Sequence, residues 1–135
     1  MKKLLAIYIF MGICISVSAS NNEISFIRNF YDNYIFGNQD FDPSGKKMCS
    51  QKMLNYLSSK YDFDCPDKAC YALWCFRSGN QDGPSDISKV TEISPLDKGW
   101  YKVDFIDMGN SGSKYIKLIT SDQKTEIDEL KDQME

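Results

Sequence analysis

The chain has 135 residues, with 16 lysines and arginines against 19 aspartates and glutamates, five cysteines and no histidine. This length predicts one domain. The lack of histidine excludes a Ser-His-Asp triad, a Cys-His dyad and a His-ligated metal site. The sequence therefore names no reaction, although it does indicate a compartment and an architecture.

Residues 1–19 have the pattern of a secretory signal peptide. A basic start is followed by a mainly apolar stretch over residues 4–17, and small residues precede a cleavage site after Ala19. The apolar run is about 14 residues, below the roughly 20 that a membrane-spanning helix needs. We expect export to the periplasm or the exterior, with no stable membrane anchor after cleavage. Lipid attachment at Cys14 and an uncleaved anchor are the alternatives.

Cleavage makes the chain more acidic. Removing the two leader lysines leaves 14 basic against 19 acidic residues, a net charge of −5. Such a surface repels phosphate backbones, and the sequence has no basic stripe interleaved with aromatic residues. We expect no nucleic-acid partner.

Four cysteines remain after cleavage, an even number that predicts disulfides in an exported chain. Cys65 and Cys70 flank a turn-like stretch that starts at Pro66, whereas Cys49 and Cys75 lie in patterns that face the interior. Of the three possible connectivities we predict Cys65–Cys70 with Cys49–Cys75. A zinc site built from all four thiols is the alternative, although only the last three approach the usual ligand spacing.

Helical spacing of apolar residues marks the first half of the mature chain. Residues 22–36 predict a helix with Asn22 as its N-cap and Gly37 at its end. Residues 44–61 predict a second helix, capped by Ser44. Its predicted inward face carries Met48, Cys49, Met53, Leu54 and Leu57. Between this helix and residue 86 we expect loops around a compact apolar segment at residues 70–76.

The second half changes to the period of β-strands. Residues 87–93 predict a weak strand that ends before a turn at 96–99, and residues 101–105 alternate clearly between apolar and polar. A hairpin turn is expected at 110–112, followed by strands at 115–120 and 125–130. Helices followed by consecutive strands predict an α+β fold, with N-terminal helices packed against a curved antiparallel sheet formed by the C-terminal half.

One loop is similar to the start of a calcium-binding loop. Asp40, Asp42 and Ser44 place oxygen ligands at positions one, three and five, and Gly45 follows at position six. Gln51, however, stands at the twelfth position, where such loops carry a bidentate glutamate. The alternative is an ordinary linker between helices, and no other cofactor is indicated.

Trp74, Arg77 and Trp100 are candidate ligand-binding residues. Tryptophan can line a pocket or stack on a sugar, and arginine can clamp an anion. The alternatives are core packing for Trp74 and, for Arg77, a structural bond to Asp82 or Asp86.

Asp62, Asp64 and Asp67 form an acidic cluster. Glycoside hydrolysis uses two carboxyl groups about 5–10 Å apart across a cleft. The alternative interpretation is a solvated loop.

Several short strings resemble a known family, the exported bacterial domains of unknown function of the YqhG/YbjP-like type. The strings are Gly79-Asn80-Gln81-Asp82-Gly83-Pro84, Ile27-Arg28-Asn29-Phe30-Tyr31-x-x-Tyr34, Leu118-x-x-x-Asp122 and Glu126-Ile127-Asp128-Glu129-Leu130. The resemblance implies a nuclear-transport-factor-2-like (cystatin-like) cone over residues 22–131, with helices cupped by a curved antiparallel sheet. It implies no catalytic residues.

Together these observations predict an exported module of the cell envelope that binds a small ligand or an envelope protein and is not catalytic. The alternatives are a carboxylate-dependent enzyme, or an inhibitor, acting on cell-envelope glycans.

Overall fold

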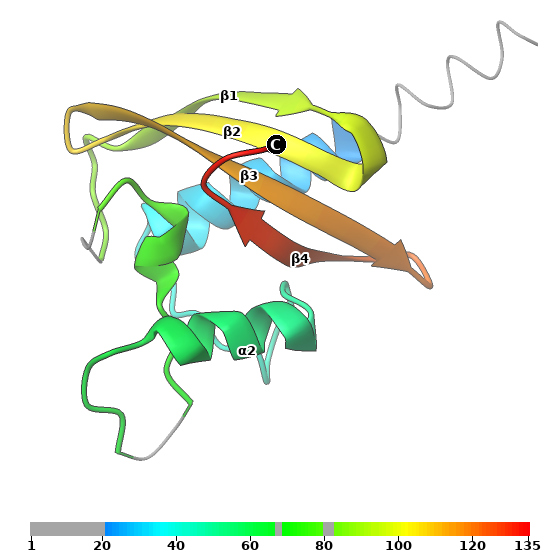
Figure 1. The fold of residues 1–135 in the computed structure, drawn as a ribbon. Coiled ribbons are helices and arrows are strands. Elements are labelled where there is room, and N and C mark those ends of the chain that lie inside the picture. Colours follow the sequence, from blue (N-terminus) through cyan, green and yellow to red (C-terminus); the bar gives the residue numbers. More distant parts are fainter. Residues whose placement is uncertain (1–20, 67–68, 80–82) are drawn as a thin grey trace, which may run out of the picture.

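The computed structural model describes residues 21–66, 69–79 and 83–135. The predicted signal peptide, Asp67 and Asp82 lie outside these residues. Helices from the N-terminal half pack on a four-stranded antiparallel sheet from the C-terminal half, which confirms the predicted α+β fold (Figure 1).

The sheet is a meander in which each strand pairs with the next. Its strands are β1 (Lys89–Pro95), β2 (Trp100–Asp107), β3 (Asn110–Ser121) and β4 (Lys124–Lys131), and their spatial order is β1-β2-β3-β4. Register shifts leave one extra residue in β1, between Val90 and Glu92, and one in β4, where Asp128 stands opposite the step from Lys117 to Leu118 of β3. Bulges of this kind bend a sheet and increase its twist.

The first helix forms over the predicted range, except that Asn22, the predicted N-cap, already lies inside it. Residues 21–30 are α-helical and continue into a π-helical turn, η1 (Tyr31–Ile35). A Cβ atom on Gly37 would lie 2.2 Å from the carbonyl oxygen of Asp32 and 2.6 Å from that of Asn33. Only glycine allows the backbone to pass this close, which explains why the helix ends here.

The second helix is shorter than predicted. α2 (Gln51–Lys60) begins after Ser50, whose hydroxyl oxygen accepts a hydrogen bond from the Met53 N–H at 3.1 Å. The predicted cap Ser44 instead hydrogen-bonds the Asp42 side chain. Residues 48–50 are extended because they pair with β4: the Ile127 N–H donates to the Met48 carbonyl, and the Ser50 N–H donates to the Ile127 carbonyl. An edge strand has unpaired backbone groups, and this pairing satisfies some of them.

The predicted hairpin turn at 110–112 is wrong. These residues belong to β3, and the chain turns at Met108 and Gly109, which have φ angles of 53° and 88°. A two-residue turn of type I′ requires positive φ at both central residues. The turn at 96–99 is confirmed, with η3 at Asp97–Gly99.

The core lies between the first helix and one face of the sheet, called here the inner face. It is dominated by aromatic rings: Phe30, Tyr31, Phe76 and Phe105 are fully buried. The Tyr31 hydroxyl donates a hydrogen bond to the Phe76 carbonyl at 2.8 Å. This bond fixes η2 (Leu73–Phe76) against the first helix, and η2 in turn positions Trp74 and Arg77.

Candidate functional site

Of the two predicted disulfides, one forms. The Cys65–Cys70 bond is confirmed, with a Cα–Cα distance of 6.0 Å. The predicted Cys49–Cys75 bond is wrong, because both residues are free thiols. Cys49 is buried beside β4 through its pairing with Ile127, whereas Cys75 is half-buried in η2 and borders a surface pocket. The zinc alternative also fails, because Cys65 and Cys70 are joined to each other.

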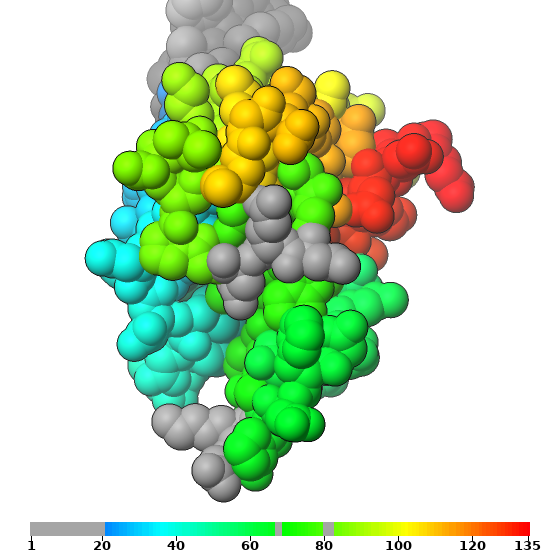
Figure 2. All heavy atoms as spheres, turned by 90° about the vertical axis from the view of Figure 1, so that its left-hand side faces the viewer, coloured from blue at the N-terminus to red at the C-terminus, as the bar shows by residue number. Residues whose placement is uncertain are grey.

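The disulfide joins the two arms of what we call the stapled loop, residues 61–66 and 69–71. Asp62, Phe63 and Asp64 directly precede the ring that the bond closes between Cys65 and Cys70. In Figure 1 this green loop extends away from the sheet beyond α2, and Figure 2 places it at the end of the molecule opposite the strands. Asp62 and Asp64 are both exposed on it. The loop therefore presents its side chains on a projection.

Three aromatic rings, two from this loop and one from η2, form a cluster. Tyr61, Phe63 and Trp74 lie with their ring centroids 5.4–5.9 Å apart in each pair. Phe63 is 66% exposed, more than any other large apolar side chain among the described residues. The cluster joins the loop to η2, because Trp74 belongs to that element.

On its other side Trp74 borders a pocket of about 270 Å³ between α2, η2 and β3, which we call the η2 pocket. Tyr56 and Lys60 come from α2, Cys75 from η2 and Lys114 from β3. Lys114 forms an ion pair with Asp132, which lies directly after β4. Burial raises the pKa of the Cys75 thiol, and the nearby ammonium groups of Lys114 and Lys60 partly oppose that rise.

Arg77 lies at the same pocket, but all three of its guanidinium nitrogens already donate hydrogen bonds within the protein. Its Nε and Nη2 donate to the two carboxylate oxygens of Asp107 at 3.1 and 2.7 Å, and its Nη1 donates to the Gly83 carbonyl at 2.7 Å. The side chains of Arg77 and Asp107 are 3% and 1% exposed. The alternative prediction, that Arg77 bonds a structural aspartate, is thus confirmed, but this aspartate is Asp107 rather than Asp86.

The strand pattern of the sequence also predicts that the Asp107 side chain points into the core. The apolar alternation that places Tyr101, Val103 and Phe105 on the inner face continues to Asp107, so the strand pattern points this acid inward. The hydrogen bonds from Arg77 lower the pKa of Asp107, opposed by burial and supported by the Ser78 N–H and the Ser88 hydroxyl.

Trp100 does not join the other two candidate ligand-binding residues. It lies on the opposite face of β2 from Tyr101 and pairs with Lys117 of β3. Its ring is covered by Lys131, whose Nζ lies 5.0 Å from the ring centroid. The structure thus brings Trp74 and Arg77 to one pocket and leaves Trp100 elsewhere.

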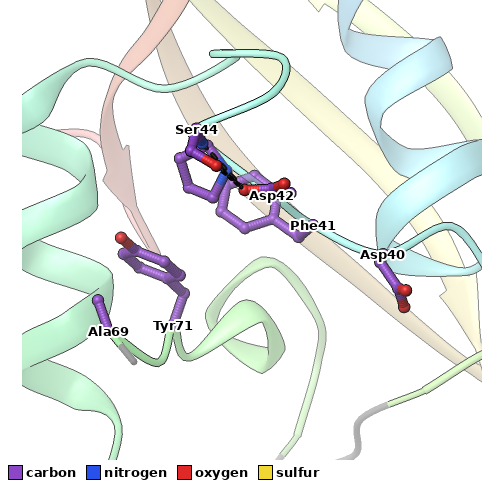
Figure 3. Close-up of a pocket in the computed structure, with 7 residues that line it drawn as sticks. Asp40, Phe41, Asp42, Ser44, Ala69 and Tyr71 are labelled. Carbon is purple, nitrogen blue, oxygen red and sulfur yellow. Dashed lines mark hydrogen bonds between the residues drawn. The ribbon is translucent and has the colours of Figure 1, made fainter. Parts of the chain in front are cut away.

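The calcium-like loop is not organised as a ligand set. The Asp42 carboxylate accepts hydrogen bonds from the Ser44 N–H at 3.0 Å and from its hydroxyl at 2.6 Å, whereas Asp40 points away from both (Figure 3). The three residues border a cavity of about 610 Å³ together with Phe41 and Tyr71. Within residues 21–66, 69–79 and 83–135, no group of three or more His, Cys, Asp or Glu residues is arranged to hold a metal ion.

Comparisons with known proteins identify no relative: no family model, curated protein or solved structure matches the chain. In the part of the chain that the structure covers, no helix is both long and apolar enough to cross a membrane. The residues of the site alone therefore indicate its chemistry. These are a projecting aromatic cluster beside two acids, and a pocket that holds two lysines, a thiol and two aromatic rings.

Proposed function

We propose that the protein is an exported, non-catalytic binding module of the cell envelope that docks on a partner protein through its stapled loop. The exposure of Phe63 on a projection, two residues before the disulfide-bonded Cys65, is the observation that carries the proposal. Aromatic side chains that insert into a partner's pocket are typical anchors of protein interfaces. Fully burying such a side chain contributes about 1.5–3 kcal/mol.

The Phe63 side chain is held in place before it binds. Contacts with Tyr61 and Trp74 hold the Phe63 ring, and the Cys65–Cys70 disulfide restricts the backbone that follows it. A pre-ordered binding element loses less conformational entropy on association, so more of its contact energy appears as affinity. A disulfide is also the bond expected of a protein that works in an oxidising compartment.

The shape and charge of the loop indicate what kind of surface it fits. A projection needs a concave partner, and Asp62 and Asp64 flank Phe63 on either side. Complementary charge selects partners and steers their encounter. We therefore expect a cleft with an apolar floor and a rim of lysine or arginine.

A second candidate function is inhibition of an envelope enzyme that acts on glycans, and the projection itself favours it. A loop that fills an active-site cleft blocks access of the substrate. The carboxylate-dependent enzyme has weaker support, because Asp62 and Asp64 are both exposed on the loop. Turnover of a glycan substrate by the purified protein, abolished by Asp64→Asn, would overturn the non-catalytic proposal. The family resemblance stays a prediction.

The docking proposal predicts that Phe63→Ser weakens partner binding at least tenfold while the protein stays folded. Ile87→Ser is the matched control, because Ile87 is 61% exposed and lies outside the stapled loop. The three proteins would be used for affinity capture from envelope extract, and the affinity for the purified partner would then be measured. Equal affinity of the Phe63→Ser and Ile87→Ser variants would contradict the proposal.

A further inference from the structure

The η2 pocket contains a lysine where the sheet pattern calls for an apolar residue. Lys114 pairs with Val103 and lies two positions before the buried Ile116, so it occupies the inner face of the central strand β3. Its side chain is only 15% exposed. Desolvating an ammonium group is costly, so such a lysine needs an anionic partner.

The anionic partner of Lys114, the carboxylate of Asp132, is replaceable. Asp132 forms the ion pair, yet its side chain is 82% exposed and follows the last strand in a stretch without helix or strand. Holding such an exposed side chain in one position costs conformational entropy, so Asp132 adds little net stability as a partner. Another carboxylate could therefore take the place of Asp132 at small cost.

The rest of the pocket is suited to the body of such a ligand. Trp74 and Tyr56 supply aromatic surface, and Lys60 places a second ammonium 5.6 Å from the centroid of the Tyr56 ring. Arg77 and Asp107 neutralise each other, so two lysines face the single carboxylate of Asp132. The pocket thus has an excess of positive charge in a chain whose net charge is −3.

We propose that the η2 pocket binds a small aromatic carboxylate, with the carboxylate on Lys114 and the aromatic body against Trp74, and that Asp132 is its intramolecular competitor. A volume of about 270 Å³ lies just below the 300–1,000 Å³ range of drug-sized sites, which fits a ligand of metabolite size. This site goes beyond the proposed docking function and is independent of it. The carboxylate could belong to a free small molecule or to the end of a peptide.

The test measures binding of 3-phenylpropionate to the mature protein by calorimetry or NMR titration, with 3-phenylpropionamide as the neutral analogue. We expect the acid to bind and the amide to bind at least tenfold more weakly. Lys114→Met should abolish binding, whereas Lys117→Met, on the other face of β3, should not. Asp132→Asn should tighten binding severalfold by removing the competitor, whereas Asp122→Asn, an exposed acid before β4, should not.

Three results would overturn the proposal: equal binding of acid and amide, no effect of Asp132→Asn, or binding of inorganic phosphate as tight as that of the aromatic acid. The Asp132→Asn arm keeps the test decisive if Lys114→Met fails to fold. An N-acetylated dipeptide that ends in phenylalanine distinguishes the sources, and tighter binding of either the dipeptide or 3-phenylpropionate supports the site. Phe63→Ser should leave the affinity unchanged, so failure of the docking proposal does not affect this one.

Discussion

The Arg77–Asp107 pair connects the segment after η2 to the end of β2. A buried ion pair is held by geometry as much as by charge, because both groups have lost their water. Here the carboxylate also accepts hydrogen bonds from Ser78 and Ser88, so three positions of the chain meet at one acid. The pair therefore stabilises one wall of the η2 pocket without taking part in binding.

The lowered pKa of Asp107 predicts a loss of stability in acid. The unfolded chain takes up the proton at the ordinary carboxyl pKa of about 3.9, above the pKa of Asp107 in the folded protein. The stabilisation is therefore complete above that ordinary value and is lost as the pH falls through the lower folded pKa. The free energy of unfolding in urea, measured from pH 6 to pH 2.5, should fall more steeply for the native protein than for Asp107→Asn. Parallel curves would show that Asp107 contributes nothing to the acid response.

At the scale of single elements, the end of the first helix depends on Gly37. Gly37→Ala would place a Cβ atom 2.2 Å from the Asp32 carbonyl oxygen, so the backbone must move. Overpacking of this kind costs about 1–3 kcal/mol. Gly45→Ala is the control, because its Cβ would meet nothing closer than 3.5 Å. Urea unfolding should separate the two variants, and an unchanged midpoint for Gly37→Ala would refute the role of this close approach.

Elements with a clear period could be predicted from the sequence, and elements fixed by distant partners could not. The alternation of apolar and polar residues around Val103 predicted β2, and the helical spacing of apolar residues predicted the first helix. The start of α2 was missed because Ser44 and Ser50 are both good caps, and the choice between them depends on the bonds of residues 48–50 to Ile127. The turn at Met108 was missed because a polar Asn-Ser-Gly string follows it.

The candidate site was predicted only in part, for the same reason. Trp74 was identified as a ligand-binding candidate, and the disulfide beside it was predicted from its turn-like spacing. Lys60 and Lys114 were not found, because they are distant in sequence and meet only when α2 and β3 close over η2. The failure of the Cys49–Cys75 prediction has the same origin, since apolar surroundings alone do not bring two thiols together.

Considered as a whole, the described part of the chain holds one disulfide and two free thiols. Burial raises the pKa of the Cys49 thiol to about 12, with nearby Glu126 adding to the rise, whereas Cys75 is half-buried. We expect maleimide to label Cys75 alone in the native mature protein and both cysteines after unfolding without reductant. Mass spectrometry counts the adducts. If the unfolded protein carried no adduct, Cys49 and Cys75 would have to be joined by a disulfide.

The two sites have opposite charge. The stapled loop carries exposed acids, whereas the η2 pocket gathers lysines, and Trp74 contributes to both. A protein partner and a small carboxylate would thus be recognised by different chemistry on adjoining surfaces.

The pairing of residues 48–50 with β4 has a consequence for how copies of this protein behave together. An open sheet can grow by adding strands from other molecules at its two edges. One edge is partly capped by these residues, and the other, β1, is interrupted by a bulge and ends in Pro95, which has no N–H to donate. The meander is therefore poorly suited to strand exchange or fibrous polymerisation between copies of this protein.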